Sequence, residues 1–311
     1  MRILVTGGAG FIGSHITDAL VGADHSVTVL DDLSSGRREN VSLEAHLRVM
    51  DIRSPDIETL FDEIQPEVVY HEAAQMDVRR SVADPVFDAS VNVLGGLNLY
   101  EQCRRTGVKK IMLASTGGAI YGEQDFFPAT ESHPTQPVSP YGVAKLANEK
   151  YLEYYNAVYG LDSVCLRYAN VYGPRQSPHG EAGVVAIFSD LLLKGKQPVI
   201  YGTGKQTRDY VFVGDVAQAN LLALGCEGSD VLNVGTAIET DVNELFARIQ
   251  TSAGTDLPEK HEPAKVGEQM RSVVSWEHIN NRLGWEPKVA LEDGINQTVD
   301  WFRTEMTETS D

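Results

Sequence analysis

The sequence has few of the features that mark secreted, membrane or metal-binding proteins. Its 311 residues include three cysteines, Cys103, Cys165 and Cys226, which form no CxxC pair. No disulfide framework or cysteine-based metal site is therefore expected. No apolar run reaches the ~20 residues that cross a bilayer. The chain begins directly with a motif rather than a signal peptide. We expect a cytoplasmic protein that does not bind a membrane.

Positive charge is also scarce. The chain has 26 Lys and Arg against 44 Asp and Glu, a net charge of −18 at pH 7. A surface of this sign repels nucleic acid and anionic membranes, so no nucleic-acid partner is expected. Only ten of the basic residues are lysine. This bias, together with the acidity, leads to the hypothesis that the protein works in a salty cytoplasm.

The sequence does contain a regular alternation of short apolar runs with longer amphipathic stretches. The apolar runs, rich in β-branched residues, predict strands at Ile3–Val5, Val27–Leu30, Leu47–Met50, Val68–Tyr70, Ile111–Ala114 and Val164–Tyr168. The amphipathic stretches predict helices at Phe11–Val21, Ile57–Gln65, Val86–Thr106 and Tyr141–Val158. Strands that alternate with helices indicate an α/β fold with a Rossmann-type, doubly wound parallel sheet.

The pattern changes after residue 170. Asn170–Gly183 and Asp256–Gly267 are expected to be a loop and an exposed connector. Shorter elements are predicted near 183–195, 208–213, 215–225, 231–234 and 242–252. We expect a nucleotide-binding domain over 1–170, to which segments near 208–235 return. Residues 171–311 would form mainly a smaller C-terminal α/β substrate-binding cap.

A glycine cluster follows the first predicted strand. Gly7, Gly10 and Gly13, with Gly8 between them, fit both GxxGxxG and GxGxxG, and a helix begins inside the pattern at Phe11. Glycines there allow a tight turn and a close approach to a pyrophosphate, which the helix N-terminus attracts. The context of strand, glycines and helix predicts a dinucleotide site.

Acidic residues at the next two strand ends extend this site. Asp31 and Asp32 follow the second strand, where a carboxylate accepts hydrogen bonds from a ribose diol and repels a 2′-phosphate. NAD is therefore favoured over NADP, although Arg37 and Arg38 lie close enough in sequence to accommodate a phosphate. Asp51 follows the third strand and is either an adenine contact or an exposed turn acid.

A tyrosine and a lysine share one face of a predicted helix. Ser139 suits the N-cap and Pro140 the first turn, which places Tyr141 and Lys145 four residues apart. A tyrosine base near neutral pH needs its pKa lowered by about three units, or roughly 4 kcal/mol. A nearby ammonium and a positive nicotinamide could supply this. The alternative is an ordinary amphipathic helix, and the glycine cluster favours catalysis.

Several further residues are candidates. Ser115 and Thr116 end a strand at the carboxyl edge of the sheet, where open α/β folds bind ligands. Arg208 and Arg271 could neutralise substrate phosphates, although each could also be a surface arginine. His71-Glu72 lacks the second histidine of HExxH, because Gln75 stands in its place, so no metal is expected.

With these motifs in order, the chain resembles the extended short-chain dehydrogenase/reductase family, and within it the UDP-glucose 4-epimerases and related nucleotide-sugar epimerases. The motifs that carry the resemblance cover nearly the whole chain. They are Thr6–His15 (TGGAGFIGSH), Asp31–Gly36 (DDLSSG), His71–Gln75 (HEAAQ), Ser115–Gly122 (STGGAIYG), Tyr141–Lys145, Arg167–Arg175 (RYANVYGPR), Tyr201–Asp215 (YGTGKQTRDYVFVGD) and Leu283–Pro287 (LGWEP).

The resemblance implies a UDP-sugar substrate and a bound NAD. Tyr141 would remove the 4-hydroxyl proton as the C4 hydride leaves, and the 4-keto sugar would rotate before the hydride returns. Lys145 would tune Tyr141, and Thr116 would bridge the substrate and the tyrosine. The NAD-lining residues would be Gly7, Gly10, Phe11, Ile12, Gly13, Asp31, Asp32, Asp51, Ile52, Ala73, Ala74, Gln75, Asn92, Tyr141, Lys145 and Tyr168. The substrate side would be formed by Thr116, Asn170, Arg208 and Arg271.

The sequence departs from one common family pattern at Gly117, which is often a serine, so either Thr116 or Ser115 could supply the hydroxyl. Dehydratases and decarboxylases of the family usually place acids after this threonine, whereas Gly117 and Gly118 follow here. This favours simple epimerisation of UDP-glucose and UDP-galactose. Ser272 stands near a position where bulky residues exclude N-acetyl sugars, so those sugars are a possible extension.

The alternatives are an epimerase of UDP-N-acetylglucosamine or UDP-glucuronate, a dTDP-glucose 4,6-dehydratase and, from a different class, a non-catalytic dinucleotide sensor. The family also implies a homodimer. The predicted helices 86–106 and 141–158 are candidates for an intermolecular four-helix bundle, although their apolar residues could equally face the chain's own sheet.

Overall fold

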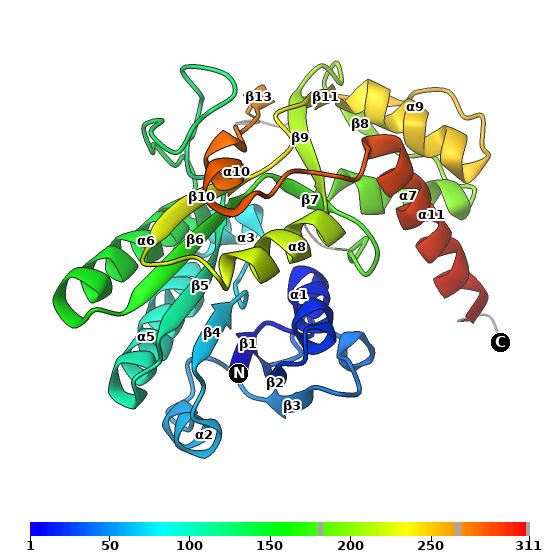
Figure 1. Ribbon diagram of the computed structural model, residues 1–311. Helices are drawn as coiled ribbons and strands as arrows, with labels where there is room; N and C mark the ends of the chain where they lie inside the picture. The colour runs from blue at the N-terminus through cyan, green and yellow to red at the C-terminus, as the bar shows by residue number, and fades with distance from the viewer. Residues whose placement is uncertain (180–182, 265–268, 309–311) are drawn as a thin grey trace.

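A seven-stranded parallel sheet forms the centre of the molecule. The computed structural model describes residues 1–179, 183–264 and 269–308 (Figure 1). The strand order is β10-β6-β5-β4-β1-β2-β3. These strands are β1 (Arg2–Thr6), β2 (Ser26–Asp31), β3 (His46–Val49), β4 (Val68–His71), β5 (Lys110–Thr116), β6 (Asp162–Tyr168) and β10 (Asp230–Val234). The order reverses between β1 and β4, as in a Rossmann fold, so the predicted fold class is confirmed.

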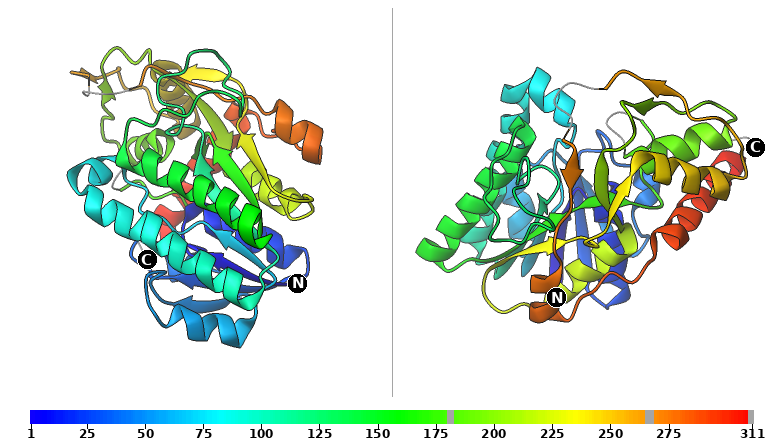
Figure 2. Two further views of the ribbon diagram at one scale, coloured as in Figure 1. Left: turned by 90° about the vertical axis from the view of Figure 1, so that its left-hand side faces the viewer. Right: turned by 90° about the horizontal axis from the view of Figure 1, so that it is seen from above.

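Helices cover both faces of this sheet (Figure 2). One face carries α1 (Phe11–Gly22) and α8 (Val213–Ala223), and the other carries α2 (Ile57–Ile64), α5 (Gly95–Thr106) and α6 (Pro140–Tyr159). Side chains alternate along a strand, so Ile3 and Val5 of β1 pack into the first core and Leu4 into the second. Both faces of the sheet are therefore apolar and covered by helices. The carboxyl edge of the strands is where an open α/β sheet binds its ligand.

A smaller unit stands beyond that edge. Its sheet has the path β11-β9-β13, and β7 also pairs with β9. The strands are β7 (Asn170–Tyr172), β9 (Thr207–Phe212), β11 (Glu239–Asp241) and β13 (Arg271–Ser272), and β8 (Ile200–Tyr201) pairs with β12 (His261–Glu262). The helices are α7 (Val184–Leu193), α9 (Val242–Ala253) and α11 (Leu291–Glu308), whereas α10 (Glu277–Leu283) packs against β10 of the large sheet. α7, α9 and α11 pack together and enclose a separate core.

The structure corrects several expectations in this later region. Strand β7 lies inside the expected loop 170–183, and β12 lies inside the expected connector 256–267. Residues 180–182 and 265–267 of those two segments are outside the described residues. The strand expected at 208–213 does not return to the large sheet, because β7, β11 and β13 pair with it in the small one. Of the described elements that follow it, helix α8, strand β10 and helix α10 pack with the large unit. The domain boundary at residue 170 stays a prediction.

The helix expected over 86–106 is divided. It consists of α4 (Pro85–Ala89), a π-helical segment (Ser90–Leu94) and α5, and a further short helix, α3 (Val78–Ala83), precedes it. The π-helical segment turns Asn92 inward, where its side chain is 2% exposed and bonds the backbone of Gln75. Tertiary hydrogen bonds therefore decide this detail, which periodicity does not reveal.

Candidate active site

The glycine cluster forms a tight turn between β1 and α1. Gly7 has φ +70°, and a Cβ on it would lie 2.6 Å from Ala73 N. A Cβ on Gly13 would lie 2.3 Å from Gly7 O, so neither position tolerates a side chain. A Cβ on Gly10, the N-cap of α1, would meet only Gly7 O within 4 Å. No side chain of the described residues caps this helix N-terminus, which leaves its amides available to a diphosphate and fits an NAD pyrophosphate.

The acids at the strand ends lie in different environments. Asp31 is 7% exposed, and its carboxylate accepts hydrogen bonds from Ala9 N (3.0 Å) and Leu33 N (2.8 Å). Burial raises the pKa of Asp31. Asp31 thus borders the glycine turn, where a ribose would be recognised.

The other two acids bond to neighbours in their own loops. Asp32 accepts from Ser34 N and Oγ. Asp51 pairs with Arg53 at 2.5 Å, and the hydrogen bonds from Arg53 lower the pKa of Asp51. Ile52, next to Asp51, packs beneath Gly95, where a Cβ would meet its Cδ1 at 2.6 Å. The structure therefore brings Asp31 to the glycine turn more directly than Asp32 or Asp51.

Helix α6 presents the predicted tyrosine and lysine at its first turns. Ser139 Oγ accepts from Gly142 N (3.1 Å), and Pro140 is the first helical residue, so the predicted capping is confirmed. Lys145 is 3% exposed and donates from Nζ to Ala114 O of β5 (2.7 Å). The same Nζ lies 5.8 Å from the centroid of the Tyr141 ring. The two side chains therefore meet beside the carboxyl end of β5.

The electrostatics of this pair depend on burial and on nearby carboxylates. Burial raises the pKa of Tyr141, and the charges of Asp88 and Glu72 raise it further. Burial lowers the pKa of Lys145, against the raising effect of Glu72, Asp88 and Glu149. Burial also raises the pKa of Glu72. Within the described residues, burial and these two carboxylates therefore favour the neutral form of Tyr141.

The two candidate hydroxyls differ in direction. Ser115 Oγ donates to Glu149 Oε1 (2.5 Å) and is 3% exposed, so it faces the interior. Thr116 Oγ1 accepts from Ala119 N (3.1 Å). A Cβ on Gly118 would lie 3.9 Å from Thr116 Oγ1 and 3.7 Å from the side-chain oxygen of Asn170. Thr116 and Asn170 are therefore neighbours around Gly118.

The structure separates the two candidate arginines. Arg208 pairs in register with Thr240 and Ser272, and Thr207 with Arg271. Since side chains alternate, Arg271 projects from the face opposite to Arg208. It bonds Glu239 at 2.7 and 2.9 Å and stacks 3.6 Å from the centroid of the Phe127 ring. The structure thus does not bring Arg271 together with Arg208, and its cationic charge is already paired.

The remaining predicted contacts lie at the end of β4 and β6. Ala73 packs against Gly7, and Gln75 and Asn92 bond each other beyond it. The hydroxyl of Tyr168 donates to Glu72 Oε1 (3.3 Å) and accepts from Asn220 Nδ2 (2.8 Å). Tyr168 therefore joins the β4 end to helix α8.

Sequence reasoning missed four buried ionic groups around the pair. Glu72 and Asp88 act on both Tyr141 and Lys145, and Glu149 lies below Lys145, bound to Arg167 at 2.6 Å. The i+4 spacing of Glu149 from Lys145 was a readable signal of a shared helix face. Asp88 also has a partner at i+4, Asn92, but its other partner, Gln75, lies thirteen residues earlier in a separate loop, and the sequence gives no signal of that pairing.

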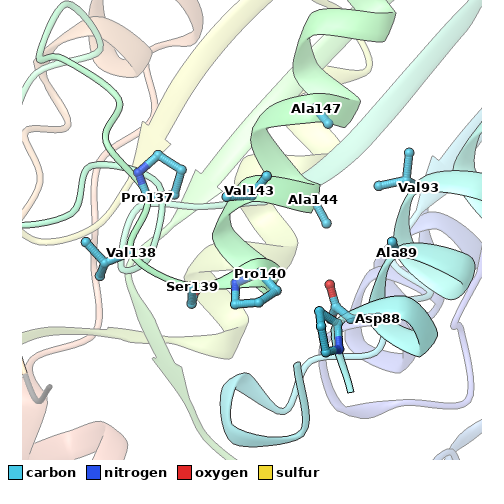
Figure 3. Close-up of a pocket in the computed structure, with 11 residues that line it drawn as sticks. Asp88, Ala89, Val93, Pro137, Val138, Ser139, Pro140, Val143, Ala144 and Ala147 are labelled. Atoms are coloured by element: carbon cyan, nitrogen blue, oxygen red, sulfur yellow. The ribbon is translucent and has the colours of Figure 1, made fainter. Parts of the chain in front are cut away.

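The described residues form no group of three or more His, Cys, Asp or Glu that could hold a metal ion. No helix within the same ranges is long and apolar enough to cross a membrane. A groove of about 580 Å³ lies between α4 and α6 (Figure 3), and its lining includes Asp88, Val93, Val143 and Ala147.

Comparisons with known proteins agree with this geometry. A family model described as the NAD dependent epimerase/dehydratase family matches residues 3–235. The UDP-glucose 4-epimerase of Mycolicibacterium smegmatis is 48% identical over 310 residues, covering 97% of this chain and 99% of that protein. The Thermotoga maritima UDP-glucose 4-epimerase, solved with UDP-glucose, has a TM-score of 0.97 at 46% identity, covering 98% of this chain and 100% of that one. The Thermus thermophilus UDP-glucose 4-epimerase, solved with NAD, has a TM-score of 0.93 at 48% identity, covering 97% and 99%. The chain therefore belongs to the NAD dependent epimerase/dehydratase family.

Proposed function

We propose that this protein is an isomerase that interconverts UDP-glucose and UDP-galactose by NAD-dependent epimerisation at C4. The observation that carries the proposal is the Tyr141–Lys145 pair at the capped start of α6, beside a glycine turn in which Gly7 and Gly13 have no room for a Cβ. Relatives that are 46–48% identical and cover at least 97% of this chain include the UDP-glucose 4-epimerases of Mycolicibacterium smegmatis, Thermotoga maritima and Thermus thermophilus. Family membership and site geometry therefore support the same reaction.

The residues at the glycine turn and the strand ends would hold NAD. The α1 N-terminus would bind the pyrophosphate and Asp31 a ribose diol. Of the two arginines that could accommodate a 2′-phosphate, Arg37 already faces Glu305 at 3.3 Å, which supports NAD over NADP. Gly7, Gly10, Gly13, Phe11, Ile12, Ala73, Ala74, Gln75, Asn92 and Tyr168 complete the proposed cofactor side, with Asp32, Asp51 and Ile52 on the adenosine side. When bound, NAD would supply a reversible acceptor for the hydride from C4 of the sugar.

The protein's own residues would manage the proton and the sugar. In its phenolate form, Tyr141 would accept the proton of the sugar 4-hydroxyl. It would return this proton after the 4-keto sugar has rotated in the site. Lys145, held by Ala114 O, would stabilise the phenolate, and Thr116 would bridge Tyr141 and the 4-oxygen. Asn170 and Arg208 would hold the nucleotide sugar from the small sheet, whereas the paired Arg271 would contribute less.

Epimerisation is favoured over elimination by the residues that follow Thr116. A 4,6-dehydratase needs a general acid for the loss of water. Here the two residues that follow Thr116 are Gly117 and Gly118, which have no acidic side chain. A Cβ on Gly117 would lie 3.0 Å from Val274 Cγ1, so a larger side chain there would be crowded. No acidic residue can replace Gly117 without local movement.

The test is incubation of the purified protein with UDP-galactose, UDP-glucuronate and dTDP-glucose, with products identified by NMR. The expected product is UDP-glucose from UDP-galactose, at unchanged mass. Loss of water from dTDP-glucose would indicate a dehydratase. Tyr141→Phe separates an enzyme from a dinucleotide sensor: it should keep bound NAD and lose at least about 100-fold in kcat. Full activity of this variant would contradict the proposed base.

UDP-N-acetyl sugars are a second candidate substrate class. Ser272 is 3% exposed and pairs with Arg208, so its small side chain lies on the same face as the proposed phosphate ligand. Ser272→Tyr should abolish turnover of UDP-N-acetylgalactosamine and leave UDP-galactose within a few-fold. No turnover of the N-acetyl sugar by the wild-type protein would exclude this extension.

We also propose that two copies associate through α5 and α6, which lie side by side (Figure 2). The exposed apolar residues Val143, Tyr151, Tyr154 and Val158 follow helical spacing along one face of α6. The helix α5 and the π-helical segment before it expose one large apolar side chain, Leu94, and charged ones that include Arg104 and Arg105, so the apolar part of this surface lies mainly on α6.

The three cysteines are free and buried, in keeping with a cytoplasmic location.

A further inference from the structure

The side chain of Asn92, in the π-helical segment, holds the loop that follows β4 through two hydrogen bonds. Asn92 Oδ1 accepts from Gln75 N (2.8 Å), and its Nδ2 donates to Gln75 O (2.9 Å). Both backbone polar groups of Gln75 are thus held by one side chain. The loop cannot move relative to the π-helical segment without breaking both bonds.

Asp88 adds hydrogen bonds to both Gln75 and Asn92. Its Oδ1 accepts from Gln75 Nε2 (2.9 Å) and from Asn92 Nδ2 (2.9 Å), and the residue is 1% exposed. Figure 3 shows Asp88 on α4, across the groove from Pro140 and Ala144 of α6. One buried carboxylate oxygen therefore orients both side-chain amides.

The hydrogen-bonded group of Gln75, Asp88 and Asn92 lies between the glycine turn and helix α6. On one side the loop begins at Ala73, whose N would lie 2.6 Å from a Cβ on Gly7. On the other side Asn148 of α6 donates from Nδ2 to Asn92 O (2.9 Å) and to Ala144 O (2.8 Å). Asn148 follows Lys145 by three residues, so the same hydrogen-bonded unit touches the glycine turn and the helix of Tyr141 and Lys145.

We propose that Asp88 is a positioning residue for NAD binding, which sets the distance between the glycine turn and α6 through Gln75 and Asn92. The inference rests on the proposed function, because it assumes that NAD occupies this turn. Asp88 acts through its acceptor geometry: without an acceptor, Gln75 Nε2 loses one of its partners, and Asn92 is free to rotate away from the Gln75 backbone. The Gln75 loop then no longer holds its place beside Gly7.

The experiment compares Asp88→Ala and Asp88→Asn with Asp84→Ala. The asparagine variant keeps an oxygen that can accept from both amides, whereas the alanine variant has none. Asp84 is the matched control, because it is exposed on the same helix and only caps it, accepting from Phe87 N at 3.0 Å. The readouts are calorimetric titration of nucleotide-free protein with NAD, kcat, KM for UDP-galactose, and the thermal midpoint.

Asp88→Ala should weaken NAD binding about tenfold, in line with the loss of charged hydrogen bonds, and lower kcat, with KM for UDP-galactose unchanged. Asp88→Asn should restore NAD affinity to within about threefold, and Asp84→Ala should keep it while lowering the thermal midpoint. If Asp88→Ala does not fold, Asp88→Ser replaces it, since its side chain is too short to reach both amides.

Three results would overturn the inference: wild-type NAD affinity in Asp88→Ala (or in its serine replacement), equal losses in Asp88→Asn and Asp88→Ala, or an equal loss in Asp84→Ala. A wild-type protein that binds no NAD would instead contradict the proposed function. The wild-type titration therefore tests the function, and the ratios between variants test the role of Asp88.

Discussion

Ser115 and Thr116 are adjacent on β5, and their hydroxyls serve different purposes. Ser115 joins a buried group in which Glu149 also bonds Arg167 through two nitrogens (2.6 and 3.0 Å). This group ties α6 to β5 and β6. Thr116, one residue on, projects from the other side of the strand toward Gly118 and Asn170. The alternation of a strand thus separates a structural hydroxyl from a candidate catalytic one.

Replacing each hydroxyl separately tests this division. Thr116→Val should lower kcat roughly 100-fold, the usual cost of one donor at a developing oxyanion, with little change in stability. Ser115→Ala should lower the free energy of unfolding by about 1–2 kcal/mol, because Glu149 loses a buried donor, and leave kcat within a few-fold. Steady-state epimerisation and urea unfolding measure both. A larger kcat loss in Ser115→Ala would assign the catalytic role to Ser115.

His71 gives the stability a pH dependence. It is 2% exposed and bonded to Thr6 Oγ1 (2.9 Å). Burial, with a smaller effect from Lys145, lowers the pKa of His71 from 6.5 to about 3. Between these values the unfolded chain binds the proton and the folded protein does not. The stabilisation is therefore complete above pH 6.5 and is lost as pH falls, by about 1.4 kcal/mol per pH unit.

Urea unfolding at pH 6.5, 5.5 and 4.5 measures this slope. His71→Gln, which cannot take up the proton, should show a smaller loss of stability per pH unit, by about 1.4 kcal/mol. His46→Gln is the control, since His46 is exposed on β3, and should behave as wild type. Equal slopes in wild type and His71→Gln would contradict the burial argument.

At the scale of elements, α6 has two faces with separate roles. Lys145, Asn148 and Glu149 point inward and hold the helix to β5, the π-helical segment and β6. The opposite face carries the exposed apolar stripe of Val143, Tyr151, Tyr154 and Val158. One helix therefore positions the reaction and offers a surface for a second copy.

Charge placed in the stripe should separate the copies. Tyr154→Glu with Val158→Glu should halve the mass measured by light scattering after gel filtration, because two carboxylates would be buried without partners. Glu153→Lys, a charge change on the polar side of the same helix, should leave the mass unchanged. A wild-type protein that is monomeric at micromolar concentration would contradict the proposed dimer.

For the whole molecule, the net charge of −18 is a property of the surface rather than of the site. The proposed site meets anionic ligands with backbone amides and Arg208, and its own carboxylates, Asp31, Glu72 and Asp88, are a small part of the 44 acidic residues. Most ion pairs that the structure describes are at least partly exposed, and exposed pairs contribute little each. Repulsion among the remaining acids opposes folding at low ionic strength.

Potassium chloride should therefore stabilise the protein. Raising KCl from 0.1 to 2 M shortens the screening length from about 10 Å to less than about 3 Å, which weakens this repulsion. We expect the thermal midpoint and the epimerase activity to rise. NaCl at the same ionic strength is the control and should act similarly if screening is the cause. A midpoint or an activity that falls with molar KCl would count against adaptation to a salty cytoplasm.

The class of fold, the glycine turn and the start of α6 could be predicted from the residues along the chain. These are local features: apolar periodicity, the spacing of the glycines between a strand and a helix, and the Ser139-Pro140 cap. The sequence also placed Tyr141 and Lys145 on one face, since four residues make about one helical turn. Short-range geometry suffices for each of these conclusions.

The groups that surround this pair could not be predicted in the same way, because they come from segments that meet only in the folded chain. Ser115 faces Glu149, Arg271 is bound to Glu239, and Asp88 meets Gln75 across thirteen residues of chain. The π-helical turn at Asn92 and the pairing of β7 with β9 also depend on contacts between distant segments. Burial and long-range hydrogen bonds fix these choices, and neither can be read from the spacing of residues along the chain.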